Sequence, residues 1–218
     1  MGLTIHWDLE FRGTDQEVFE KLQELRTLAE KLPLAKIEGP AGLDYASFQK
    51  AYKARKRYGG WKHWASIQGG FADGKRVEKA FCLFMWPGEG CEPMNIGLRR
   101  LDNSGNWDWA SFCKTQYAEE FVKAHLLVIR ILDECKRLGI LKEVHDEGHY
   151  WETRDLGKLG HNINESTKMI EGLFGKLAKT FGKKNIEAPI TETKTHVTKL
   201  EVDAVKKLHK PLPPNSRN

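Results

Sequence analysis

Residues 3–11 alternate strictly between apolar and polar side chains, and this alternation restricts the first element of the chain to a strand. The apolar positions are Leu3, Ile5, Trp7, Leu9 and Phe11. Successive side chains of a strand point to opposite faces, so we expect one face to be buried and the other exposed. Gly13 ends the strand, and Thr14 with Glu17 predicts a capping box at the start of a helix. The chain therefore begins as a strand followed by a helix.

The remaining pattern predicts an α+β fold. Further strands are expected at residues 34–38, 77–86, 94–101, 107–115 and 140–145. Further helices are expected at 46–58, at 119–138 and from Asn164 to about residue 181. Helices that separate groups of strands are typical of an α+β fold with helices on one face of a mainly antiparallel sheet. A ferredoxin-like arrangement is one candidate for this fold.

The length and composition fit one domain with an appendage. The chain has 218 residues, of which 40% are hydrophobic and 30% charged, as in ordinary globular proteins. We expect an α+β domain at 1–182, with a basic insert near 44–76, and a basic, flexible tail at 183–218. The tail carries eight basic and four acidic residues and ends in a proline-rich stretch.

Several features predict a cytoplasmic protein without a membrane partner. No apolar run approaches the roughly 18–20 residues that a membrane span requires. The first residues lack the basic and apolar regions of a signal peptide. None of the four cysteines lies in a CxxC pair, and a reducing compartment would leave them as thiols. The oligomeric state is not indicated.

The segment KEVHDEGHYWETRD, residues 142–155, holds five carboxylates and two histidines directly after an expected helix and strand. If it is one straight strand, His145, Glu147 and His149 share a face and suit a divalent metal. If Glu147 and Gly148 form a turn, the two histidines flank a hairpin. A helix is disfavoured by Gly148. An exposed hairpin with solvated charges is the simpler interpretation, and no known metal signature is present.

Two further segments carry groups that could react. The loop WPGEGCEPMN, residues 86–95, leaves an expected strand and carries Glu89, Cys91 and Glu92. The segment SFCKTQY, residues 111–117, carries Cys113, which could act as a nucleophile if His125, His145 or His149 lies beside it. A wide turn and a packed strand are the simpler interpretations of the two segments.

These segments together suggest a polar pocket in an enzyme or a ligand-binding protein that takes a small ligand. We expect general acid or base groups at Glu89, Glu147 and Glu152. A divalent metal, if one is the cofactor, would be bound by His145 and His149. The sequence does not indicate the substrate or the reaction, nor does it decide whether the protein is an enzyme.

A second hypothesis is a non-catalytic nucleic-acid-binding protein. Between residues 45 and 72 there are six basic residues and no acid, and aromatic residues alternate with the cations in 48–64. Cations contact phosphates and aromatic rings stack on bases. The candidate contacts are Lys53, Arg55, Lys56, Arg57, Trp61 and Trp64. The simpler interpretation is a basic amphipathic helix that faces water, and an assembly or adaptor protein is a third hypothesis.

Four strings of this chain carry a resemblance to a group of other proteins. They are GLTIHW near the start, WPGEGCEP, SFCKTQYA and DEGHYWETRD. In these strings the chain resembles a group of conserved proteins of unassigned function, over most of residues 1–181. The resemblance implies no activity, substrate or cofactor, and it does not extend to the basic insert or the tail.

Overall fold

The computed structural model describes residues 3–44, 71–72, 75–101, 105–116, 118 and 120–162. Three predictions lie outside these residues: the helix at 46–58, the helix that starts at Asn164, and the tail from 183 onward. The boundary at 182 between domain and tail therefore stays a prediction.

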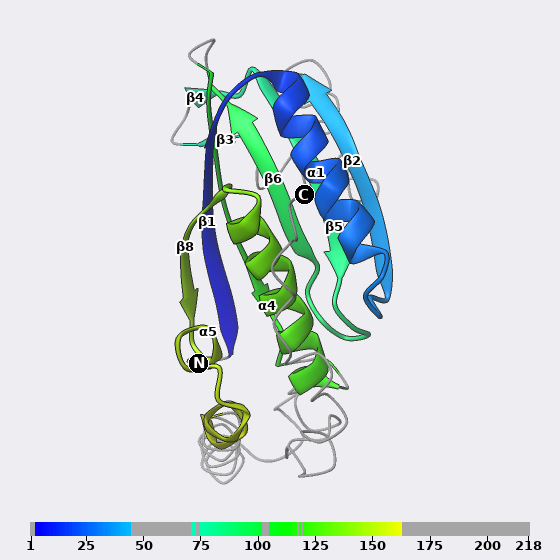
Figure 1. The fold of residues 1–218 in the computed structure, drawn as a ribbon, viewed down its shortest axis with the longest axis vertical. Helices are drawn as coiled ribbons and strands as arrows, with labels where there is room; N and C mark the ends of the chain where they lie inside the picture. The colour runs from blue at the N-terminus through cyan, green and yellow to red at the C-terminus, as the bar shows by residue number, and fades with distance from the viewer. Residues whose placement is uncertain are drawn as a thin grey trace, which may run out of the picture.

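The described residues form a six-stranded sheet with helices on one face, which confirms the α+β prediction. The strands of this sheet, in spatial order, are β2 (Lys36–Asp44), β5 (Lys79–Trp86), β6 (Met94–Arg100), β7 (Asn106–Lys114), β1 (Thr4–Arg12) and β8 (Leu141–Asp146). All neighbouring pairs are antiparallel. Helices α1 (Asp15–Ala29) and α4 (Phe121–Arg137) lie side by side on one face of the sheet (Figure 1). The remaining elements are the short strands β3 (Phe71–Ala72) and β4 (Lys75–Arg76) and the one-turn helix α5 (Tyr150–Thr153).

The narrower expectation of a ferredoxin-like arrangement is not confirmed. That arrangement has the order β-α-β-β-α-β. Here β5 and β6 are two additional strands, and they lie between β7 and β2 in the sheet. The strands nearest the candidate site are β7, β1 and β8, with β1 in the middle.

The alternation in the first strand has the expected result. Ile5, Trp7 and Leu9 are buried, whereas the intervening polar side chains of β1 are exposed. The buried face packs with α4, which buries twelve side chains along its length. One of these twelve, His125, is polar and only 1% exposed. A buried imidazole in the apolar layer needs hydrogen-bond partners, so the environment of His125 is of interest.

The capping box at the start of α1 is present. The Thr14 hydroxyl accepts a hydrogen bond from the Glu17 backbone N–H at 3.3 Å, and the Glu17 carboxylate accepts one from the Thr14 backbone N–H at 2.7 Å. These two bonds satisfy donors that a helix start otherwise leaves without partners.

Thr14→Ala is expected to lower the free energy of unfolding by about 1 kcal/mol, because it removes one half of the capping box. The matched control is Thr27→Ala, also a threonine of α1 with an exposed side chain. The Thr27 hydroxyl donates to the carbonyl of Gln23, four residues earlier, and alanine has a higher helix propensity than threonine. Thr27→Ala is therefore expected not to lower the free energy of unfolding as Thr14→Ala does. Urea unfolding of both variants checks this, and equal losses would contradict the assigned role of Thr14.

No helix in the described part of the chain is both long enough and apolar enough to cross a membrane.

Candidate functional site

The segment 142–155 is a strand, a turn and a helix. The turn considered at Glu147 and Gly148 is present, but it leads into a helix and not into the second strand of a hairpin. Strand β8 ends at Asp146, residues 147–149 turn, and α5 begins at Tyr150. His149 takes a left-handed backbone conformation with φ of 56°, which reverses the chain direction between β8 and α5. The chain is helical again over residues 156–162.

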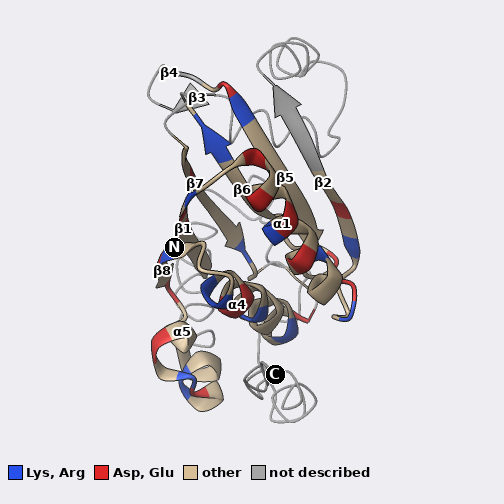
Figure 2. Ribbon diagram, turned by 45° about the horizontal axis from the view of Figure 1, so that its top comes forward, with Lys and Arg blue, Asp and Glu red and all other residues tan. Residues whose placement is uncertain are grey.

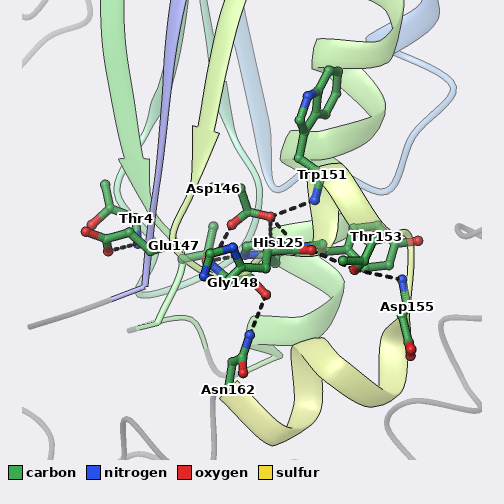
Figure 3. Close-up of polar contacts among 12 residues, drawn as sticks. Thr4, His125, Asp146, Glu147, Gly148, Trp151, Thr153, Asp155 and Asn162 are labelled. Carbon is green, nitrogen blue, oxygen red and sulfur yellow. Dashed lines mark hydrogen bonds and ion pairs between the residues drawn. The ribbon is translucent and has the colours of Figure 1, made fainter.

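The physical reason for the turn is the carboxylate of Asp146. One oxygen accepts the backbone N–H of Gly148 at 2.7 Å. The other accepts the backbone N–H groups of Tyr150 at 2.8 Å and Trp151 at 2.9 Å (Figure 3). The carboxylate is fully buried, so these bonds replace the water it has lost. A local hydrogen-bond acceptor therefore overrides the alternation that favours a continuing strand.

Asp146 also contacts the buried histidine of α4. His125 Nε2 lies 3.2 Å from Asp146 Oδ2 (Figure 3). On the other side of the imidazole, His125 Nδ1 lies 3.1 Å from the hydroxyl of Thr115, just past the end of β7. Thr115 and His125 are each 1% exposed, and Asp146 is fully buried. The three side chains form one continuous hydrogen-bonded chain from β7 through α4 to β8.

The charge state of Asp146 sets the direction of its hydrogen bond with His125. Burial acts to raise the pKa of Asp146, but the hydrogen bond and charge of His125 and the N–H groups of Trp151 and Gly148 outweigh it, and the pKa is lowered from its ordinary value. An ionised carboxylate only accepts, so Nε2 of His125 carries a proton and donates. In the neutral form of the imidazole Nδ1 then accepts from the Thr115 hydroxyl, whereas in the charged form Nδ1 donates to the hydroxyl oxygen.

The 86–95 loop meets the same end of β7. The backbone N–H of Lys114 donates to the Glu92 carboxylate at 3.3 Å. In return, the backbone N–H of Glu92 donates to the Lys114 carbonyl at 3.4 Å. The thiols of Cys91 and Cys113 lie 3.7 Å apart. The three segments singled out in the sequence, 86–95, 111–117 and 142–155, are thus joined through residues 113–115.

The three glutamates expected to supply acid or base groups are not brought together by any contact among the described residues. Glu89 is exposed in its loop, and Glu152 is exposed on α5. The carboxylate of Glu147 accepts the backbone N–H of Thr4 at 2.8 Å, which fastens the start of β1 to the turn after β8 (Figure 3). Glu147 therefore has a structural partner, and the structure gives the other two no shared site.

The two histidines expected to bind metal lie on different elements. His145 is exposed on β8, where its ring centroid is 6.2 Å from that of His6 on β1. His149 is exposed in the turn, beyond the end of β8. In the part of the chain that the structure describes, no three His, Cys, Asp or Glu side chains are grouped as metal ligands would be. The straight strand that would have aligned the two histidines is therefore absent, and metal binding by His145 and His149 stays a prediction.

The residues expected to bind nucleic acid all lie outside the described residues. They are Lys53, Arg55, Lys56, Arg57, Trp61 and Trp64. Their role stays a prediction from the sequence.

The hydrogen-bonded chain of Thr115, His125 and Asp146 was not predicted as a unit. From the sequence, His125 was interpreted as a surface or core residue of its helix, or as a base for Cys113, whereas the structure places a threonine hydroxyl against it. One signal was available: His125 interrupts the apolar residues of the most regular helix, and a histidine there must have a polar partner. The partner's position depends on strand register, which the sequence pattern does not supply.

Gly148→Ala is expected to lower the free energy of unfolding by about 1–3 kcal/mol, because the added methyl overpacks the site. A Cβ at Gly148 would lie 2.9 Å from Leu159 Cδ1 and 3.0 Å from His125 Cε1. The control is Gly88→Ala, whose Cβ would make only ordinary contacts at 3.7 and 3.8 Å. Thermal unfolding of both variants tests this, and a neutral Gly148→Ala would show that the turn is looser than described.

Comparison with known proteins assigns this chain to no family. No protein-family model matches it, and neither a curated protein nor a solved structure shows significant similarity to it. The resemblance of its four strings to a group of unassigned function therefore stays a prediction, and function has to be argued from the side chains themselves.

Proposed function

We propose that this protein is an enzyme in which His125 acts as a general base on the hydroxyl of Thr115. The observation that supports this is the continuous hydrogen-bonded chain from Thr115 through His125 to Asp146. A hydroxyl, an imidazole and an orienting carboxylate are the groups that nucleophilic catalysis uses. The reaction class that fits is acyl transfer or hydrolysis at an ester or a related activated carbonyl.

The proposed step follows from the hydrogen-bond directions. As Thr115 Oγ1 attacks the carbonyl carbon, Nδ1 of His125 takes the hydroxyl proton. Asp146 stabilises the imidazolium that forms, because its carboxylate is already held by three backbone N–H groups. The imidazolium returns the proton to the leaving group, and a water molecule then releases the acyl group by the same route.

Burial sets a requirement on this mechanism. The Thr115 side chain is only 1% exposed, so a substrate reaches it only after a neighbouring segment moves. The loop after β5 is the nearest candidate: a Cβ at Gly88 would lie 3.7 Å from the Cβ of Ala124, next to His125 in α4. Gly90 in the same loop has a φ of 74°, a conformation that glycine adopts freely. Loop movements of this kind open and close many active sites.

This proposal keeps the hypothesis of an enzyme with a polar site and changes the residues that form it. Thr115, His125 and Asp146 take the place of the three glutamates. We also propose that the protein works in the cytosol. The four cysteines, none of which is in a disulfide, support that location.

The test is hydrolysis of p-nitrophenyl esters of increasing acyl length by the purified full chain. Thr115→Val, which keeps the shape but removes the hydroxyl, is expected to lower kcat/KM at least about 100-fold. Thr115→Ser is expected to retain much of the activity. Thr27→Val, a change on the exposed side of α1, is the control. Activity that survives in Thr115→Val, or none in the wild type, would contradict the proposal.

Nucleic-acid binding is a second proposal, and it rests on the sequence. Six cations without an acid occur between residues 45 and 72. In the described part, by contrast, basic and acidic residues are interspersed along α1 and α4 (Figure 2), and Arg26–Glu30 and Arg154–Asp133 are examples of paired charges. The unbalanced cation run is therefore the segment to test.

Changing Lys53, Arg55, Lys56 and Arg57 together to Gln is expected to weaken binding of single-stranded RNA or DNA at low salt, because phosphate contacts are lost. Fluorescence anisotropy at several salt concentrations measures this. Replacing Trp61 and Trp64 by Ala should weaken binding further if bases stack there. Circular dichroism must show that each variant is folded. Wild-type protein without salt-dependent binding at micromolar concentration would remove this function.

A further inference from the structure

Two of the four cysteines form a contact that the proposed enzyme mechanism does not use. Cys91 lies in the loop between β5 and β6, and Cys113 lies near the end of β7. Their sulfur atoms are 3.7 Å apart. Each thiol also faces a carbonyl of the other segment: Cys91 Sγ lies 3.4 Å from the Lys114 oxygen, and Cys113 Sγ lies 3.1 Å from the Glu92 oxygen.

The other two cysteines provide an internal comparison. Cys82 on β5 and Cys135 on α4 are fully buried, as Cys113 is. The Cys82 thiol bonds to Asn95 Oδ1 at 2.6 Å, and in the described part of the chain neither Cys82 nor Cys135 is paired with another cysteine. Burial raises the pKa of both thiols well above its ordinary value. The close thiol pair is thus specific to Cys91 and Cys113.

We propose that Cys91 and Cys113 are a site of reversible disulfide formation, with a small-molecule disulfide such as oxidised glutathione as the oxidant. A disulfide needs the two sulfurs at about 2.05 Å, so they must approach by about 1.7 Å from the 3.7 Å they have here. We expect rotation of the two side chains and a small shift of the loop to bring about this approach. The proposal concerns a modification site and does not depend on the proposed enzyme activity.

The order of the two exchange steps follows from exposure. Cys91 is 8% exposed and Cys113 is fully buried, so the Cys91 thiolate attacks the small disulfide first. One sulfur of glutathione bonds to Cys91, and the other leaves as a thiolate. The Cys113 thiolate then attacks Cys91, forms the protein disulfide and expels the second glutathione thiolate. One glutathione disulfide is reduced to two thiols while the protein loses two thiol protons.

The second step is expected to be the slower one. Burial, and after it the charge of Glu92, raise the pKa of the Cys113 thiol, and both remain when Cys91 carries glutathione. Less thiolate is then present at neutral pH, and the thiolate is the nucleophile. The mixed disulfide on Cys91 should therefore be detectable before the protein disulfide accumulates.

The disulfide would covalently link the loop after β5 to the end of β7. The link on β7 is at Cys113, two residues before Thr115. The disulfide closes a covalent ring over the residues between 91 and 113, which includes β6 and most of β7. Cross-links of this length restrict the unfolded chain and raise the melting temperature, here by roughly 5–10 °C.

The experiment treats the full chain with oxidised glutathione at pH 8, then unfolds it and alkylates the remaining thiols. Intact mass should show four alkylated thiols before treatment and two afterwards, and peptide mapping should place the cross-link between Cys91 and Cys113. Dithiothreitol should restore all four thiols and reverse the rise in melting temperature. Non-reducing gels must show a monomeric band, so that cross-links between molecules are excluded.

Single variants separate this mechanism from general oxidation. Cys113→Ser should stop at one glutathione on Cys91, and Cys91→Ser should leave Cys113 unmodified. Cys82→Ser and Cys135→Ser, the matched controls, should form the disulfide as the wild type does. Four free thiols in the treated wild type would overturn the proposal. A cross-link that includes Cys82 or Cys135, or glutathione on Cys113 in Cys91→Ser, would do the same.

Discussion

Asp146→Asn is expected to lower the free energy of unfolding by about 1.5–3 kcal/mol, the range for hydrogen bonds to a charged group. The carboxylate accepts three backbone N–H groups and the imidazole Nε2–H of His125. An asparagine amide has only one oxygen, so its NH₂ group would face N–H donors. At least one buried donor would lose its acceptor. Urea unfolding at pH 7 measures the loss.

The same variant should change how stability depends on pH. The pKa of Asp146 is lowered in the folded protein, so its contribution is fully present above the unfolded value near 3.9 and is lost as the pH falls through the folded value. The wild-type melting temperature should therefore fall more steeply below about pH 4 than that of Asp146→Asn. Asp8→Asn, on the exposed face of β1, is the control and should behave as the wild type. A loss below about 1 kcal/mol in Asp146→Asn would show that the carboxylate does not hold the turn.

His125→Gln is expected to lower kcat on a p-nitrophenyl ester by about 100- to 10,000-fold with little change in KM, because it removes the general base. The Gln amide NH₂ can still donate to Asp146, but the side chain cannot take the proton of Thr115. His145→Gln, an exposed histidine on β8, is the control. Equal loss of kcat in both variants, or an unchanged kcat in His125→Gln, would count against His125 as the base.

Local sequence patterns predicted the parts of the fold that depend on near neighbours. The alternation in residues 3–11 became β1, and Thr14 with Glu17 became the capping box of α1. The apolar face of 119–138 became α4. The structure of each segment is determined by hydrogen bonds within the segment and by the burial of one of its faces against the core.

The candidate site depends on contacts between distant residues, and these the sequence pattern could not supply. The register places Ile5 of β1 opposite Cys113 on one side and Asp146 on the other. Two segments about 30 residues apart are thereby brought to the same end of the sheet, where His125 from α4 lies between them. The many polar groups of 142–155 made this segment a candidate for part of a site. The side chain that matters there is Asp146, which the alternation assigns to the opposite face from His145 and Glu147.

The most direct test of the proposed function is covalent labelling of Thr115 by an alkyl fluorophosphonate. If His125 takes the hydroxyl proton, Thr115 Oγ1 should attack phosphorus and expel fluoride, and peptide mass spectrometry should place the phosphonyl group on Thr115. We predict labelling in the wild type and in Thr115→Ser, much slower labelling in His125→Gln, and none in Thr115→Val. A wild-type protein that is folded and stays unlabelled, or that carries the label on another residue, would contradict the account.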